Sequence, residues 1–109
     1  MPDGLIDTNI FIHAQANDTH TEECRRFLFA LARGEIQATL EPIVLHELSY
    51  GLPRVIKQMT KRDVAAYLLM VLGWPGVLGE KALMADAVQR WSDTPGLSFA
   101  DAYLAARAA

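Results

Sequence analysis

The sequence lacks the features that mark secreted disulfide proteins and membrane proteins. Its single cysteine, Cys24, cannot form an internal disulfide bond and lies in an apolar helical pattern. We interpret it as a small buried residue of a protein in a reducing compartment. No apolar run approaches the roughly 18 residues that span a bilayer, and the N-terminus shows no secretory signal. We therefore expect a cytoplasmic protein that makes no contact with a membrane.

A strong positive charge is also missing. The formal net charge is −3, so any binding of nucleic acid must depend on a local basic patch. Apolar residues make up 51% and charged residues 21% of the 109 residues. This composition excludes disorder and is typical of one folded domain, which we place over residues 1–109.

Short apolar runs alternate with helical patterns along the chain. We expect short strands over residues 4–6, 36–40 and 77–78, each followed by a helical segment. Strands that alternate with helices favour a parallel sheet covered by helices on both faces. The predicted fold class is therefore α/β.

Capping residues and helix breakers predict where the helices begin and end. Thr19 and Glu22 have the spacing of a capping box, and Gly34 ends the helical pattern that follows. The first helix is expected to begin at Asn9, and the third to begin at Pro42 and to end at Gly51 with Pro53. The fourth is expected to begin at Thr60 with Asp63 and to end at Gly73 with Pro75. A further helix is expected over 82–91, a turn over 92–96, and the start of the last helix at Ser98.

Three acidic residues stand out against this pattern. Asp7 follows the first apolar run in GLIDTNIFI, Glu47 lies inside an apolar helix in VLHELSYG, and Asp101 lies in the first turn of the last helix in LSFADAYLAA. Each has a structural explanation as a helix cap, a solvated position or a first-turn acid. Ligands of parallel α/β sheets bind beyond the carboxyl ends of the strands, so the three carboxylates could instead meet at one sheet edge.

The segments LIDTNIFI, VLHELSYGL and LSFADAYLAA also carry a family resemblance. With them the sequence resembles the PIN-domain ribonucleases, and especially the VapC-like toxins of bacterial toxin-antitoxin pairs. The resemblance implies a three-layer α/β/α fold with a mostly parallel central sheet. It implies a pocket for Mg²⁺ or Mn²⁺ in which Asp7, Glu47 and Asp101 match the acidic positions and Thr8 and Asn9 match the neighbouring polar ones. It further implies RNA cleavage, a homodimer, and a small antitoxin protein that blocks the site.

The chemistry of the acids agrees with that resemblance. Three carboxylates held close together repel one another unless a cation neutralises them. The sequence lacks the Cys and His clusters that favour zinc, so a hard cation such as Mg²⁺ or Mn²⁺ is the better match. Thr8, Asn9 and Ser98 could hydrogen-bond a ligand carboxylate or a bound water, or they could simply belong to helix starts.

Basic residues are the candidates for contact with RNA phosphates. We single out Arg25, Arg26, Arg54 and Lys57, with Arg33, Lys61 and Arg62 nearby in sequence. Each of them is equally explained as a charged residue on a solvated helix face. His13, His20 and His46 are interpreted as surface or capping-region residues, although His46 adjoins Glu47.

Two other classes of protein compete with the nuclease. A phosphatase of the haloacid-dehalogenase type needs a second aspartate two residues after the first, and Asn9 stands there instead. A non-catalytic PIN-like interaction module is the stronger alternative, because the core helices explain most of the sequence without any site.

The sequence ends inside the helix that contains Asp101. Members of the resembled family usually continue into a further strand with a fourth acidic residue, and Glu35, Glu41 and Asp93 lie in segments that do not match that position. We therefore expect a PIN domain that is truncated at its C-terminus and lacks the last strand. If these residues are the whole protein, we expect an unpaired sheet edge and at most one tightly bound divalent ion. The alternative is a fragment whose missing tail supplies both the strand and the fourth acid.

Overall fold

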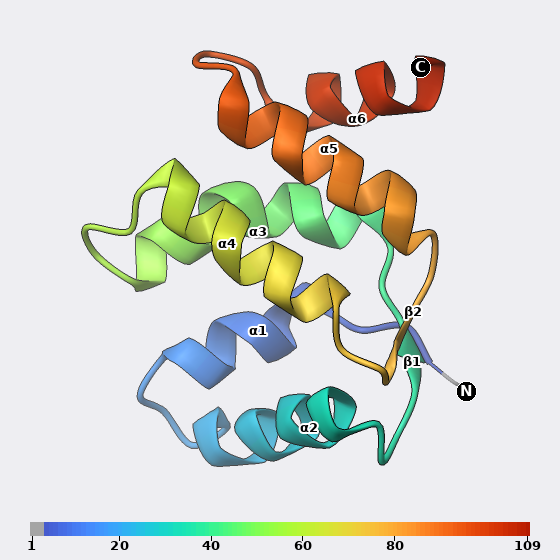
Figure 1. The fold of residues 1–109 in the computed structure, drawn as a ribbon. Helices are drawn as coiled ribbons and strands as arrows, with labels where there is room; N and C mark the ends of the chain where they lie inside the picture. Colours follow the sequence, from blue (N-terminus) through green and yellow to red (C-terminus); the bar gives the residue numbers. More distant parts are fainter. Residues whose placement is uncertain (1–3) are drawn as a thin grey trace.

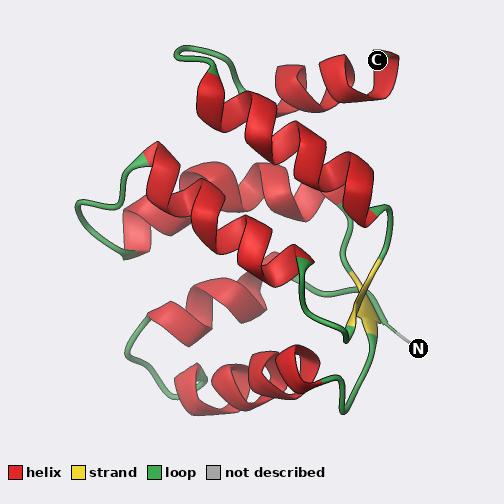
Figure 2. Cartoon of the chain, viewed as in Figure 1, coloured by secondary structure: helices red, strands yellow, loops and turns green. Residues whose placement is uncertain are grey.

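The computed structural model describes residues 4–109, and Figure 2 shows that helices dominate them. The helices are α1 (Thr8–Gln15), α2 (Thr21–Arg33), α3 (Pro42–Val55), α4 (Lys61–Leu72), α5 (Lys81–Asp93) and α6 (Phe99–Ala108), and the strands are β1 (Ala38–Thr39) and β2 (Val77–Leu78). No helix in this part of the chain has both the length and the apolar character needed to traverse a bilayer.

The sheet is parallel, as the sequence predicts, but small. Ala38 pairs with Val77 and Thr39 with Leu78, and Leu5 forms a parallel bridge with Thr39. The Ile6 N–H donates to the Thr39 carbonyl at 2.9 Å and the Thr39 N–H donates to the Gly4 carbonyl at 3.1 Å. β1 therefore lies between β2 and the extended segment 4–6.

The predicted strand over residues 36–40 is too long. Only Ala38 and Thr39 form β1, because the Glu35 N–H still donates to the Ala30 carbonyl at the end of α2 and Pro42 already begins α3. The predicted strand over residues 4–6 is reduced to the single bridge at Leu5.

The helices pack as three pairs beside this sheet. Figure 1 shows α1 with α2, α3 with α4, and α5 with α6, stacked in that order. The helix–sheet mixture and the parallel strands fit an α/β fold, whereas the three-layer arrangement stays a prediction.

Aromatic and leucine side chains form the core within and between the helix pairs. The rings of Phe11 and Tyr67 pack edge to face with their centres 6.4 Å apart and join α1 to α4. The rings of Trp91 and Phe99 pack in the same way, with centres 6.2 Å apart, and join α5 to α6. Cys24 is half-buried against this core. Burial raises the pKa of its thiol, which fits a packing role rather than a nucleophile.

Several predicted helix limits are confirmed. Gly34 ends α2 in the left-handed conformation with φ 76°, Pro42 occupies the first turn of α3, and Gly73 ends α4. The capping box of Thr60 and Asp63 is complete, because each side chain accepts a hydrogen bond from the backbone of the other.

Other predicted limits are wrong. Thr19 and Glu22 form no capping box, since α2 begins at Thr21 and the Asp18 carboxylate accepts the His20 N–H at 2.8 Å instead. Gly51 and Pro53 do not end α3, which continues to Val55. Pro53 lies inside α3, and Leu52 directly before it is buried in the core, where its burial offsets part of the cost of the missing N–H.

Candidate functional site

Asp7 lies where the sequence places it, directly after the first extended segment. It is the N-cap of α1, and its Oδ1 accepts the Asn9 N–H at 3.2 Å. Its side chain is exposed beside the sheet. The structural explanation for Asp7 as a cap is therefore present in the molecule, and the bond engages one of its two oxygens.

Glu47 is tied to the start of α1 by a side-chain hydrogen bond. The Thr8 Oγ1 donates to the Glu47 Oε1, although the two residues are separated by 39 positions. Both side chains are half-buried, so Glu47 is not a freely solvated acid. The contact brings the second acidic segment next to the residue that follows Asp7.

Asp101 lies on α6, which packs against α3. It occupies the first turn of α6, where its backbone N–H donates to the Oγ of the N-cap residue Ser98 at 3.1 Å. Figure 1 shows α6 on the opposite side of α3 from α1. The structure therefore joins Glu47 to the first acidic segment, and α6, which carries Asp101, packs against the helix that carries Glu47.

The side chains of the candidate site are of the types that bind a divalent ion, but their positions do not form a metal site. Carboxylate and hydroxyl oxygens are ligands that Mg²⁺ and Mn²⁺ prefer. Yet no three His, Cys, Asp or Glu side chains within residues 4–109 stand close enough together to hold a metal ion. The donor types fit such an ion, whereas the described residues do not group three of these side chains.

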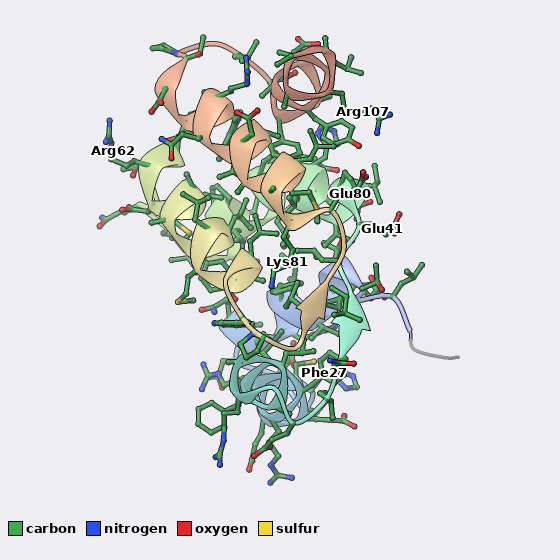
Figure 3. All side chains as sticks on the ribbon, turned by 45° about the vertical axis from the view of Figure 1, so that its right-hand side comes forward. Phe27, Glu41, Arg62, Glu80, Lys81 and Arg107 are labelled. Carbon is green, nitrogen blue, oxygen red and sulfur yellow. The ribbon has the colours of Figure 1, made fainter. Side chains whose placement is uncertain are left out.

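Two further acids follow the strands at the same edge of the sheet as Asp7, and the sequence analysis did not place them there. Leu5, Thr39 and Leu78 lie side by side in the parallel pairing, and each is followed two residues later by an acid: Asp7, Glu41 and Glu80. Figure 3 shows Glu41 and Glu80 on the same side of the molecule, beside the strands. The parallel register of the three segments would have indicated this arrangement, but a comparison of motifs does not use strand register.

The candidate phosphate-binding residues are distributed over separate elements and have local partners. Arg25 donates from Nε to the Ala14 carbonyl at 2.8 Å, Arg26 pairs with Glu22 at 2.6 Å, and Arg54 lies 5.7 Å from the centre of the Tyr50 ring. Lys57 is exposed after α3. Figure 3 shows Arg62 on the opposite side of the molecule from Glu41 and Glu80, so these charges do not form one patch around the acids.

The histidines divide into two groups. His13 contacts the Asp18 carboxylate at 2.8 Å at the end of α1, and this hydrogen bond together with the His20 N–H lowers the pKa of Asp18. His46 packs edge to face on Tyr50 with ring centres 5.6 Å apart. Among residues 4–109, the His46 Nδ1 is the buried side-chain polar atom that has no hydrogen-bond partner.

Comparison with known proteins adds one finding. A family model described as the PIN domain matches residues 4–109, which include all three acidic segments. No curated protein and no solved structure gives a significant match to the chain.

Proposed function

The chain belongs to the PIN-domain family, whose members are generally nucleases, and on that premise we propose that it is a metal-dependent endoribonuclease. The observation that supports the proposal is the span of the family match. It covers Asp7, Glu47 and Asp101 in the order and context of the three motifs.

The proposed roles follow from residue chemistry. In this proposal, Asp7, Glu47 and Asp101 would hold the Mg²⁺ or Mn²⁺ ion through their carboxylates. When bound, such an ion polarises a phosphodiester, lowers the pKa of a water molecule and stabilises the leaving oxygen. Thr8 orients the Glu47 carboxylate through its hydrogen bond, and Asn9 and Ser98 position the segments of Asp7 and Asp101.

The substrate and partners are part of the same proposal. Arg25, Arg26, Arg54 and Lys57 contact the phosphates of the RNA, each contributing to a salt-sensitive affinity. The protein is a VapC-like toxin of the cytoplasm, acts as a homodimer and is inhibited by a cognate antitoxin. These points extend the family resemblance to this chain.

One experiment tests the nuclease directly. Purified protein is incubated with a fluorescent single-stranded RNA, with Mg²⁺, with Mn²⁺ and with EDTA. We expect cleavage that requires the ion and is absent from the Asp7→Asn variant. Cleavage that persists in EDTA and in Asp7→Asn would contradict the proposal.

A non-catalytic PIN-like module is the second candidate, and it is favoured by the absence, within residues 4–109, of three His, Cys, Asp or Glu side chains grouped to hold a metal ion. Thermal unfolding with and without Mn²⁺ distinguishes the two, because an ion that binds the folded state raises its stability by mass action. A melting temperature that does not respond to Mn²⁺ or Mg²⁺, together with intact RNA, would favour the module.

A further inference from the structure

A pocket opens where α1, α2 and the turn between α4 and β2 meet. Its volume is about 260 Å³, and the residues that line it include Gln15 of α1, Arg25 and Phe29 of α2, and Trp74 of the turn. Figure 1 shows this turn beside the end of α2. None of the lining residues is acidic, although the chain carries a formal net charge of −3. The pocket therefore offers positive charge on a protein that is negative as a whole.

Two aromatic side chains from distant parts of the sequence line this pocket. Phe29 is 63% exposed, and the Arg33 guanidinium lies over its ring, 5.4 Å from the centre. Trp74 is half-buried against the core, and its backbone carbonyl accepts a hydrogen bond from the Lys81 Nζ at 2.9 Å. Both rings are thus held in place, and Phe29 has a large aromatic area left to cover.

Arg25 supplies the positive charge of the pocket. Its Nε donates to the Ala14 carbonyl at 2.8 Å near the end of α1, and no ion pair within residues 4–109 involves Arg25. The bond fixes the guanidinium beside the pocket. Because only Nε is engaged in it, the terminal nitrogens are available to an anionic ligand such as a phosphate.

We propose that this pocket binds one nucleotide of single-stranded RNA, with its base against Phe29 and Trp74 and its phosphate on Arg25. The inference rests on the proposed action on RNA and adds a substrate subsite to it. Trp74 precedes β2, whereas Asp7, Glu41 and Glu80 follow the strands. The subsite therefore lies toward the other end of the strands from these acids, and it contributes to affinity for RNA rather than to the chemical step.

The size and chemistry of the pocket favour a nucleotide over other occupants. Seven residues line it, whereas a stable protein interface uses about 20–30 residues on each side. Its volume of about 260 Å³ is also below the range of about 300–1,000 Å³ that is typical of small-molecule pockets. Aromatic rings beside a positive charge are the combination that binds single-stranded nucleic acid, because every base has a flat aromatic face and every phosphate is negative.

RNA binding without cleavage tests the subsite. The affinity for a short fluorescein-labelled oligouridylate is measured by fluorescence anisotropy in EDTA. We expect Phe29→Leu, which keeps an apolar side chain but removes the ring, to weaken binding at least about fivefold, and Phe29→Tyr to retain the affinity. The matched control is Leu104→Ala on α6, a residue that is 62% exposed and outside the pocket.

The salt dependence of the same affinity tests the phosphate contact. Arg25→Gln should reduce the slope of log K against log salt by about 0.7, the value for one phosphate of a single strand. Arg62→Gln is the matched control, because Arg62 is an exposed arginine of α4 and does not line the pocket. An equal reduction of the slope by both variants would overturn the contact of Arg25 with a phosphate.

Photocrosslinking of thiouridine-containing RNA to the unmodified chain guards against a variant that fails to fold. Crosslinks should fall on the peptides that contain Phe29 or Trp74. Parental affinity in Phe29→Leu, or crosslinks confined to other peptides, would overturn the subsite. Weaker self-association of Phe29→Leu with unchanged RNA affinity would assign the pocket to a protein contact instead. If ion-dependent RNA cleavage persists in those cases, the subsite alone has failed, whereas a parent that neither binds nor cleaves RNA would refute the proposed function as well.

Discussion

At the scale of single residues, each of the three acidic motif residues takes part in a hydrogen bond that stabilises the fold. Asp7 caps α1 through its carboxylate, Glu47 accepts the Thr8 hydroxyl, and Asp101 donates its N–H to the cap of α6. The sequence predicted which acids to consider, because the motifs and their spacing can be read from the sequence alone. It could not predict the row of Asp7, Glu41 and Glu80, which depends on the register of strands that are distant in sequence.

Replacement of the acids by their amides separates the two roles. Asn caps a helix about as well as Asp, so Asp7→Asn should change the free energy of unfolding by less than about 0.5 kcal/mol. The same change removes a ligand charge, and we expect it to abolish RNA cleavage, as we do for Asp101→Asn and Glu47→Gln. Cleavage rates and urea unfolding of each variant provide the measurements. A variant that cleaves RNA at the parental rate would limit that residue to a structural role.

The capping box at the start of α4 makes stability depend on pH. The Thr60 N–H donates to the Asp63 carboxylate at 3.0 Å, and this bond lowers the pKa of Asp63 below its ordinary value of 3.8. A lowered pKa contributes stability above the unfolded-state value, and that contribution is lost as the pH falls through the folded-state value. We therefore expect the melting temperature of the parent to exceed that of Asp63→Asn at pH 7, with a difference that shrinks below pH 3.8. A difference that stays constant into acid would contradict this account.

At the scale of elements, local rules succeeded where one residue decides the geometry. Gly34, Pro42, and Thr60 with Asp63 gave correct helix limits. The rules failed at Pro53, which lies inside α3 next to the buried Leu52. They also failed at α2, where Asp18 in the preceding loop binds the backbone that Thr19 was expected to cap.

The junction of α2 with the sheet depends on the absence of a side chain at Gly76. A Cβ at this position would lie 2.3 Å from the Ile36 carbonyl oxygen and 2.6 Å from that of Leu31. Both obstacles are backbone, so Gly76→Ala should destabilise the protein by about 1–3 kcal/mol or more. Gly73→Ala is the matched control, because the nearest atom there is 3.4 Å away. Urea unfolding of both variants measures the difference, and equal midpoints would mean that the backbone at Gly76 moves freely.

At the scale of the whole molecule, the sequence predicted the class of the fold and not the arrangement of its layers. Alternating patterns predict parallel strands joined by helices, and the three short segments do pair in parallel. How six helices stack depends on side-chain packing between distant segments, such as Phe11 with Tyr67. The position of Asp101 depends on the same packing, which is why the motifs alone could not say whether the acids meet.

The last prediction concerns the sheet edge at Leu5. The segment 4–6 bonds to Thr39 on one side, no other strand within residues 4–109 pairs with it, and the Leu5 side chain is 68% exposed. An apolar edge with unpaired backbone groups is a template for pairing with a second chain, and two such edges could join in the proposed homodimer. A charged residue on an edge opposes that pairing, so Leu5→Lys should weaken self-association by at least about tenfold, equivalent to about 1.4 kcal/mol, while the melting curve at low concentration stays unchanged. Leu78→Lys on β2 is the matched control, since Leu78 lies at the opposite edge of the sheet and is 41% exposed. Sedimentation velocity over a concentration series gives the dissociation constants. Equal constants for the parent and Leu5→Lys would mean that the copies join through another surface, and a weaker constant for Leu78→Lys alone would assign the interface to β2.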